Sequence, residues 1–200
     1  MGSDLGVKQK NIVILISGGG SNMQAIVEAS RRGDWASRYS AKVQAVMSNK
    51  AHAGGLAWAQ AQGLATAALD HKAFDSREAF DAAMMAQIDR FDPVLVVLAG
   101  FMRILTPAFV DHYAGRLINI HPSLLPAFPG LDTHQRAIDS GCRFAGCTVH
   151  RVTAELDHGE ILDQAVVPVL PGDSAPLLAQ RVLSQEHRLF PAVVERLIAS

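Results

Sequence analysis

Three polar residues of this sequence are candidates for chemistry at an oxygen that gains negative charge, and two of them also have a suitable spacing. Asn119 and His121 stand two apart at the end of an apolar run, so on a strand both side chains point to one face. The Asn119 amide is a neutral donor for an oxygen that gains negative charge, and the His121 imidazole can donate a hydrogen bond or pass a proton. Asp157, in a turn-like segment, is predicted to orient the His121 ring and favour its charged form. The spacing does not establish contact, so a structural role stays open for each.

A glycine-rich loop, Ser17–Asn22, lies between the first apolar run and a helical pattern. Glycines let the backbone N–H groups at a helix start approach an anion closely. A Walker loop is excluded because no Gly-Lys-Ser/Thr follows, and a dinucleotide fingerprint is weak because Met23 stands at the third glycine position. The loop is therefore predicted to bind a monophosphate through Gly20, Ser21 and Asn22, with a simple tight turn as the alternative.

Two other kinds of site are not favoured. A serine hydrolase needs Gly-x-Ser-x-Gly, and the loop around Ser21 lacks the final glycine. Cys142, Cys147 and His150 form an incomplete zinc ligand set, so we expect no metal and two buried thiols.

Composition limits the class of protein. The chain has 200 residues, 49% of them hydrophobic and 18% charged, which is enough to bury a core and argues against disorder. A formal net charge of -1 offers no general attraction for nucleic acid or an acidic membrane. The longest apolar stretch, Val94–Met102, is far shorter than the roughly 20 residues of a membrane-spanning helix. With only two cysteines, we expect a cytoplasmic protein. The sequence leaves its oligomeric state open between a monomer and a homodimer.

Short apolar runs alternate with helical patterns, and this alternation predicts the fold. The predicted strands are Asn11–Ile16, Val43–Met47, Ala65–Leu69, Val94–Leu98, Leu117–Ile120, Cys147–Val152 and Ile161–Val169. The predicted helices are Ser21–Arg31, His52–Gln62, a segment from Asp75 or Ser76 to about Arg90, His134–Ser140, and a last helix capped by Asp173 or Ser174 that carries Leu177, Leu178, Val182 and Leu189. We therefore predict an α/β, Rossmann-like, mostly parallel sheet with helices on both faces, mixed or antiparallel in its C-terminal part.

Several of these segments together resemble the glycinamide ribonucleotide transformylases, which are folate-dependent formyltransferases. They are Ser17–Asn22, Ser48–Lys50, Leu98–Leu105, Asn119–Pro126 with Phe128–Gly130, and Gln185–His187. The resemblance implies the formyltransferase fold. It also implies a phosphate-binding half at about 11–115 and a folate and catalytic half at about 116–200. From the low apolar content of the first residues and the length of the chain, we expect a mobile leader at residues 1–10 and one domain at 11–200.

The resemblance also implies a reaction and a site. A formyl group would pass from 10-formyltetrahydrofolate, as co-substrate, to the amine of glycinamide ribonucleotide, with Asn119, His121 and Asp157 as catalytic residues. Gly20, Ser21 and Asn22 would hold the phosphate, and the segment of Leu183, Ser184, Gln185 and Glu186 would help to fix the ribose and glycinamide. The implied folate pocket consists of Arg77, Met102, Arg103, Ile104, Leu105, Asn119, Thr153, Ala154, Glu155, Leu156 and Asp157.

Two positions depart from the family pattern. His158 follows Asp157 where a small residue is usual, so a second imidazole could compete for the carboxylate. Gly19 stands where asparagine is frequent, which could loosen the phosphate contacts. A 10-formyltetrahydrofolate hydrolase and a catalytically silent nucleotide-binding module stay open as alternative functions.

Overall fold

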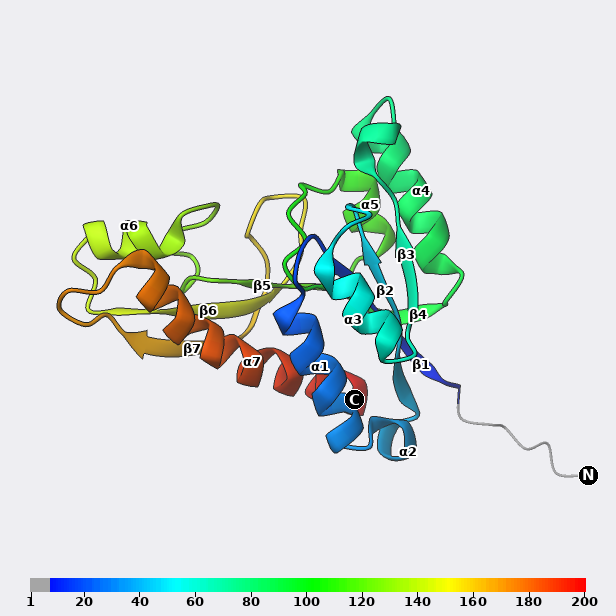
Figure 1. Cartoon of the computed structure of the whole chain (residues 1–200), viewed down its shortest axis with the longest axis horizontal. Helices are drawn as coiled ribbons and strands as arrows, with labels where there is room; N and C mark the ends of the chain where they lie inside the picture. The colour runs from blue at the N-terminus through cyan, green and yellow to red at the C-terminus, as the bar shows by residue number, and fades with distance from the viewer. Residues whose placement is uncertain (1–7) are drawn as a thin grey trace, which may run out of the picture.

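The computed structural model describes residues 8–200, which fold around a single seven-stranded sheet (Figure 1). The strands are β1 (Lys10–Ile16), β2 (Ala41–Ser48), β3 (Ala65–Ala68), β4 (Pro93–Leu98), β5 (Leu117–His121), β6 (Phe144–Arg151) and β7 (Ile161–Pro168), in the order β3-β2-β1-β4-β5-β6-β7. The pairs from β3 to β5 are parallel, whereas β5–β6 and β6–β7 are antiparallel. The predicted mostly parallel sheet with an antiparallel C-terminal part is confirmed.

Seven α-helices and one short 3-10 helix are present in the described residues. They are α1 (Ser21–Arg32), α2 (Trp35–Tyr39), α3 (Gly54–Ala61), η1 (His71–Ala73), α4 (Arg77–Asp89), α5 (Pro107–His112), α6 (Thr133–Asp139) and α7 (Ala175–Ala199). All five predicted helices are found, with shifted ends. The sequence did not predict α2 and α5, because helices of five and six residues are too short to show a periodic apolar pattern.

Helices cover both faces of the sheet, as predicted. Along β1, side chains alternate between the faces, so Ile14 packs into one core and Leu15 into the other. The first core is closed by α1 and α7 and the second by α4 and α5. The helix residues that fill these cores include Met23, Ile26, Val182 and Phe190 in the first, and Phe80, Met84 and Phe109 in the second.

The helix starts only partly follow the predicted caps. Ser76 caps α4, because its Oγ accepts a hydrogen bond from the Ala79 backbone N–H at 3.0 Å. Ser174 occupies the corresponding position of α7 but forms no side-chain cap. Nor does Asp173 cap this helix, since its carboxylate is engaged by Arg181 at 2.6 Å. The predicted side-chain cap of α7 was therefore wrong.

Two smaller expectations are corrected or left untested. Leu177, placed on the apolar stripe of α7, is 53% exposed, so the buried stripe begins at Leu178. Of the predicted leader, residues 1–7 lie outside the described part of the chain, and Lys10 already belongs to β1. The division into a leader and one domain stays a prediction. Among residues 8–200, no helix combines the length and apolar character needed to cross a membrane.

The sheet brings the chemically interesting segments to one edge. Strands β1, β4 and β5 are parallel, and the segments that follow them are the glycine loop Ser17–Gly20, the segment Phe101–Thr106 and the loop after His121. The carboxyl ends of parallel strands are where open α/β sheets bind ligands. Helix α7, which runs orange to red beside α1 in Figure 1, brings residues distant in sequence to this edge.

Candidate active site

His121 and Asp157 form a buried pair at the end of β5. The His121 Nδ1 lies 3.4 Å from Asp157 Oδ2, and the two side chains are only 7% and 9% exposed. Asp157 lies in the loop between β6 and β7, where its backbone takes a φ of 51°, a conformation that Asp tolerates better than most residues. The contact that the sequence could only hypothesise is therefore present.

Both ring nitrogens of His121 face oxygen acceptors. Nε2 lies 3.0 Å from the Phe128 carbonyl oxygen, which can only accept, so this nitrogen carries a hydrogen. On the other side, Asp157 Oδ2 also accepts a hydrogen bond from the Gly130 backbone N–H at 2.8 Å. Phe128 itself has a φ of 55°, which is strained for a bulky residue. The loop after β5 is thus folded tightly around the imidazole.

Asn119 lies two residues before His121 and is held from the neighbouring strand. Its Nδ2 lies 3.2 Å from Nε2 of His150, the residue directly opposite it in the antiparallel pairing of β5 with β6. His150 is 1% exposed, and its Nδ1 lies 2.9 Å from the Arg151 carbonyl oxygen. Burial is the main cause that lowers the pKa of His150. The amide is therefore anchored by a buried ring.

The glycine loop presents the start of α1 to the same edge of the sheet. Gly20, directly before the helix, has a φ of 70°, and a Cβ at this position would lie 3.0 Å from Cε of Met23. A glycine is therefore favoured at this position for both backbone conformation and space. The free N–H groups of the first turn, beginning at Ser21, give this end of α1 a partial positive charge suited to an anion.

Glu186 of α7 joins this phosphate loop to the rest of the site. Its Oε2 accepts a hydrogen bond from Asn22 Nδ2 at 2.6 Å, and the side chain is buried although the two residues are far apart in sequence. Burial raises the pKa of Glu186, while the Asn22 hydrogen bond and the nearby His187 and His121 oppose this rise. The structure thus brings together Asn22 and Glu186, which the resemblance implied as ligands of one substrate.

The other three predicted residues of this α7 segment are not equivalent. Leu183 lies three residues before Glu186 and so faces the same side of the helix. Ser184 lies two residues away, on the opposite side, where it is exposed and donates a hydrogen bond to the Arg181 carbonyl at 2.7 Å. Gln185 is half-buried. Of these, Ser184 has the least support as a substrate ligand.

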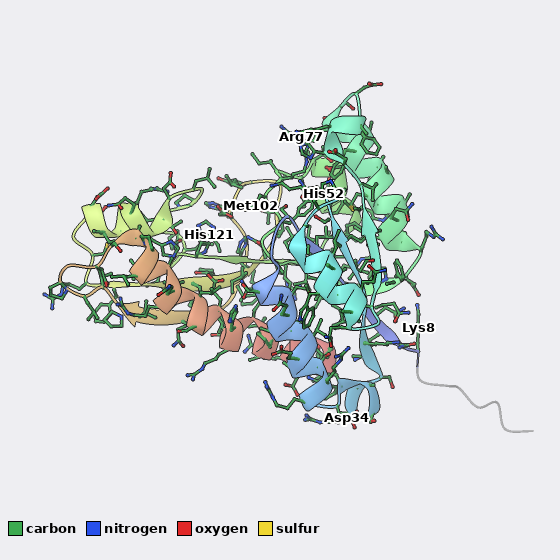
Figure 2. The ribbon with its side chains drawn as sticks, in the orientation of Figure 1. Lys8, Asp34, His52, Arg77, Met102 and His121 are labelled. Carbon is green, nitrogen blue, oxygen red and sulfur yellow. The ribbon has the colours of Figure 1, made fainter. Side chains whose placement is uncertain are left out.

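The segment Met102–Leu105 follows β4 and is tied to the phosphate loop. Ser17 Oγ accepts a hydrogen bond from the Met102 backbone N–H at 2.8 Å and donates one to Asn49 Oδ1 at 2.6 Å. The Met102 and Ile104 side chains are 69% and 58% exposed. Figure 2 shows Met102 between His121 and Arg77, the first residue of α4, in that view. Exposed apolar side chains beside polar groups are typical of a ligand-binding surface.

The loop from Thr153 to Asp157 adds a further exposed apolar residue, Leu156, at 54% exposure. Thr153 Oγ1 closes this loop, because its one hydrogen faces both the Glu155 carbonyl, at 3.2 Å, and the His158 carbonyl. The His158 ring lies 3.6 Å from the Glu155 carboxylate in an exposed pair. The His158 ring thus pairs with Glu155, whereas the Asp157 carboxylate contacts His121 and Gly130. Ala154 is exposed in the same loop.

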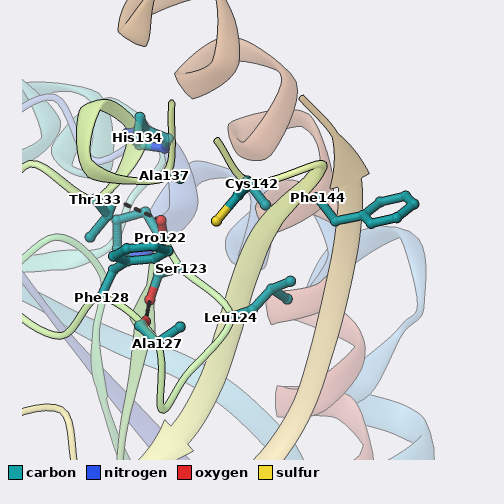
Figure 3. A pocket seen from close by; sticks show the side chains of 11 residues that line it. Pro122, Ser123, Leu124, Ala127, Phe128, Thr133, His134, Ala137, Cys142 and Phe144 are labelled. Carbon is teal, nitrogen blue, oxygen red and sulfur yellow. Dashed lines mark hydrogen bonds between the residues drawn. The ribbon is translucent and has the colours of Figure 1, made fainter. Parts of the chain in front are cut away.

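A small apolar cavity lies behind the loop that follows β5 (Figure 3). It is lined mainly by that loop, α6 and the start of β6, and Asn119, His121 and Asp157 are not among its lining residues. Two hydrogen bonds fix the loop beside it: Thr133 Oγ1 to the Pro122 carbonyl at 2.8 Å and Ser123 Oγ to the Ala127 carbonyl at 2.7 Å. The cavity therefore lies among the residues that hold the loop in place.

The sequence missed the polar residues of β6 that support the site. Thr148 Oγ1 donates to the Ser123 carbonyl at 2.7 Å and accepts from the Leu125 backbone N–H at 3.0 Å, which holds the loop to the sheet. His150 holds Asn119 on the same face of the strand. The available signal was the pair of polar residues two apart within an otherwise apolar strand. Over residues 8–200, no cluster of His, Cys, Asp and Glu is arranged to hold a metal ion.

Comparisons with known proteins agree with this geometry. Residues 10–194 match the family model described as formyl transferase. The chain is 54% identical over 184 residues to the phosphoribosylglycinamide formyltransferase of Escherichia coli K12, covering 92% of this chain and 85% of that protein.

Solved structures give the same result. The phosphoribosylglycinamide formyltransferase of Brucella melitensis has a TM-score of 0.89 at 52% identity, covering 96% of this chain and 97% of the other. Glycinamide ribonucleotide transformylase 1 of Symbiobacterium toebii has a TM-score of 0.90 at 43% identity, covering 95% and 88%. With the fold, the buried His–Asp pair and these matches in agreement, the chain belongs to the formyl transferase family.

Proposed function

We propose that this protein transfers a formyl group from 10-formyltetrahydrofolate to the amine of glycinamide ribonucleotide. The observation that carries the proposal is the buried pair of His121 and Asp157 at 3.4 Å, beside Asn119 at the end of β5. The names of the relatives at high identity over nearly the whole chain support the same reaction. The proposed site uses residues of one chain, so a monomer suffices. Both Cys142 and Cys147 are free, which fits the cytoplasm.

The ribonucleotide lies across the start of α1 in this proposal. Its phosphate accepts hydrogen bonds from the backbone N–H groups of Gly20, Ser21 and Asn22. Its ribose and glycinamide contact Glu186, with Leu183 and Gln185 beside it and Ser184 contributing little. Support comes from the Asn22–Glu186 hydrogen bond, which places a buried carboxylate next to the anion-binding loop.

The folate lies between two loops on the other side of the proposed catalytic residues. Met102–Leu105 and Thr153–Asp157 line its pocket, and Arg77 stands at the start of α4. Met102, Ile104 and Leu156 expose apolar surface that an aromatic ring system would cover. Backbone N–H and C=O groups of the loops can match the alternating donors and acceptors of a pterin edge. Within Met102–Leu105, Arg103 differs from its neighbours, because its guanidinium carbon lies 4.8 Å from the centre of the Phe80 ring. This side chain therefore packs against the protein.

The proposed reaction is a direct acyl transfer. The neutral amine nitrogen of the ribonucleotide forms a bond to the formyl carbon, whose carbonyl oxygen becomes an oxyanion. The bond between that carbon and the folate N10 then breaks. The amine nitrogen gives up one proton and N10 receives one, so atoms and charges balance. Asn119 Nδ2 donates to the oxyanion, a contribution typically worth about 2.7–4 kcal/mol of barrier.

His121 and Asp157 handle charge and proton movement in this scheme. A ring with hydrogens on both nitrogens satisfies the Phe128 carbonyl and Asp157 together, and its positive charge favours the oxyanion. We propose that the substrate oxygen replaces the Phe128 carbonyl as the partner of Nε2. Asp157 holds the ring in place and assists the transfer of the proton from the amine to N10.

The test is incubation with a 10-formyl folate, with and without glycinamide ribonucleotide. The proposal predicts deformylation of the folate only when the ribonucleotide is present, with one formylated product for each folate consumed. Release of formate without the ribonucleotide would assign the hydrolase reaction instead. Binding of the ribonucleotide without any deformylation would identify a silent binding module. The variant Asp163→Asn, in an exposed pair with Arg196, is a matched control for Asp157→Asn.

A further inference from the structure

His150 is a buried histidine that the proposed reaction does not use. It lies on β6 directly opposite Asn119, with 1% of its surface exposed. A buried polar side chain in this position needs hydrogen-bond partners on the protein, and His150 has two. They are the Arg151 carbonyl at Nδ1 and the Asn119 amide at Nε2.

These two partners fix where the ring carries its hydrogen. A carbonyl oxygen can only accept, so Nδ1 at 2.9 Å from Arg151 O must be the protonated nitrogen. In a neutral imidazole the other nitrogen, Nε2, is then an acceptor. The ring is kept neutral chiefly by burial, which lowers the pKa of His150 and outweighs the opposite effects of the Arg151 carbonyl and Asp157. His121, nearby, acts in the same direction as burial.

The orientation of the Asn119 amide follows from this tautomer. Only the NH₂ end of the amide can face the Nε2 lone pair at 3.2 Å, because the amide oxygen would meet a second acceptor there. The amide carries two hydrogens on Nδ2, so one is held by His150 and the other stays available in the site. A flipped amide would present its oxygen to the developing oxyanion and repel it.

We propose that His150 is a positioning residue that sets which end of the Asn119 amide faces the formyl oxygen. The chain of contacts runs from the Arg151 carbonyl through a neutral, Nδ1-protonated His150 to Nδ2 of Asn119. This inference rests on the proposed function, because it gives Asn119 the role of oxyanion donor. His150 itself does not touch the substrate.

Two measurements test the proposal. The first is ¹⁵N NMR of the wild-type protein with labelled histidines, assigned through the backbone, at neutral pH. The shifts should report His150 with a protonated Nδ1 and an unprotonated Nε2. Detection of the Nε2-protonated tautomer or of a doubly protonated ring would overturn the proposal. This experiment needs neither activity nor a variant that folds.

The second measurement is a double-mutant cycle on formyl transfer. His150→Phe removes the acceptor but keeps a ring, and it should lower kcat at unchanged KM for both substrates. The loss cannot exceed that of removing the donor itself, about 10²–10³-fold. In an Asn119→Ala background the same change should cause no further loss, because the two residues act through one interaction. Additive losses, or unchanged kcat in His150→Phe, would contradict the positioning role.

A matched control distinguishes a specific effect of His150→Phe from a general effect of replacing a histidine. His112→Phe alters an exposed histidine on α5, far in sequence from β6 and paired with Asp89, and should leave kcat unchanged. If the wild-type protein itself lacks transfer that depends on the ribonucleotide, the proposed function fails, while the NMR result still decides the tautomer. If the wild-type protein is active and the cycle is additive, only the role of His150 fails.

Discussion

Glu186 gives the most detailed prediction, because its burial disfavours the ionised carboxylate, whereas its proposed role as a substrate ligand requires it. The carboxylate is buried at the junction of α7 and α1 and accepts a hydrogen bond from Asn22 at 2.6 Å. Burial raises its pKa, so the folded protein disfavours the ionised form that a ligand hydroxyl or amine would prefer. A substitution that keeps shape but removes charge separates these two effects.

The perturbation is Glu186→Gln, and its effect on substrate can be estimated. A hydrogen bond to a charged group contributes about 1.5–3 kcal/mol, which corresponds to about 10- to 140-fold in affinity. We therefore expect KM for glycinamide ribonucleotide to rise by about this factor, while KM for the folate stays unchanged. In the wild type, KM for the ribonucleotide should also rise as the pH falls and the carboxylate takes up a proton. The Gln variant should lack this pH dependence.

The same variant should change stability in the opposite direction. A carboxylate whose folded pKa is raised above its unfolded value loses stability as the pH rises through that range. At neutral pH the neutral amide avoids this cost and can still accept from Asn22, so Glu186→Gln should melt at a temperature no lower than the wild type. Glu195→Gln is the matched control on α7, because Glu195 pairs with Arg38 at 3.1 Å outside the site.

Two assays test this prediction. They are steady-state kinetics with each substrate varied in turn, and thermal melting at neutral pH. An equal rise in both KM values would contradict a specific contact of Glu186 with the ribonucleotide, since it would indicate a general disturbance of the site. A large fall in melting temperature with unchanged KM for the ribonucleotide would show that Glu186 supports the fold and does not contact the substrate.

Three further predictions concern other parts of the structure. Asp157→Asn should lower kcat by at least about 10²-fold with little change in either KM, because the His121 ring loses its charged partner; retained turnover in steady-state assays would contradict this. Gly20→Ala should cost about 1–2 kcal/mol of unfolding free energy and weaken ribonucleotide binding, since φ is 70° there, and both are measurable by denaturant titration and calorimetry. Arg181 lowers the pKa of Asp173 to about 2, so the pair adds stability above the ordinary Asp pKa that is lost as the pH falls toward 2. Asp173→Asn should therefore lower the melting temperature at pH 7 but not near pH 2, and an equal loss at both would exclude the ion pair as the cause.

The central strands and long helices could be predicted from the sequence because their burial is periodic or continuous. Ile12–Ile16 of β1 are all buried, as expected of a strand covered on both faces, and Phe80, Met84 and Ile88 recur at helical spacing on α4. The sheet order was not fixed by these patterns. It depends on tertiary packing that brings β1 between β2 and β4.

The site residues could be predicted where they lie close together in the sequence. Asn119 and His121 are two apart on one strand, and the glycine loop is continuous in sequence. Asp157 was only a hypothesised partner of His121, because nothing local shows that the two residues approach each other. Glu186 came from the family resemblance alone. His150 was missed, since its role depends on the antiparallel register that places it opposite Asn119.

Asn119 is the proposed oxyanion donor, and the whole proposed reaction depends on this role. Its measurement is the kcat of Asn119→Ala, together with the dissociation constants of glycinamide ribonucleotide and the folate. We expect kcat to fall by about 10²–10³-fold while both ligands still bind at wild-type affinity. Wild-type turnover in this variant would show that Asn119 is not the oxyanion donor, as would a loss of activity explained entirely by weaker binding.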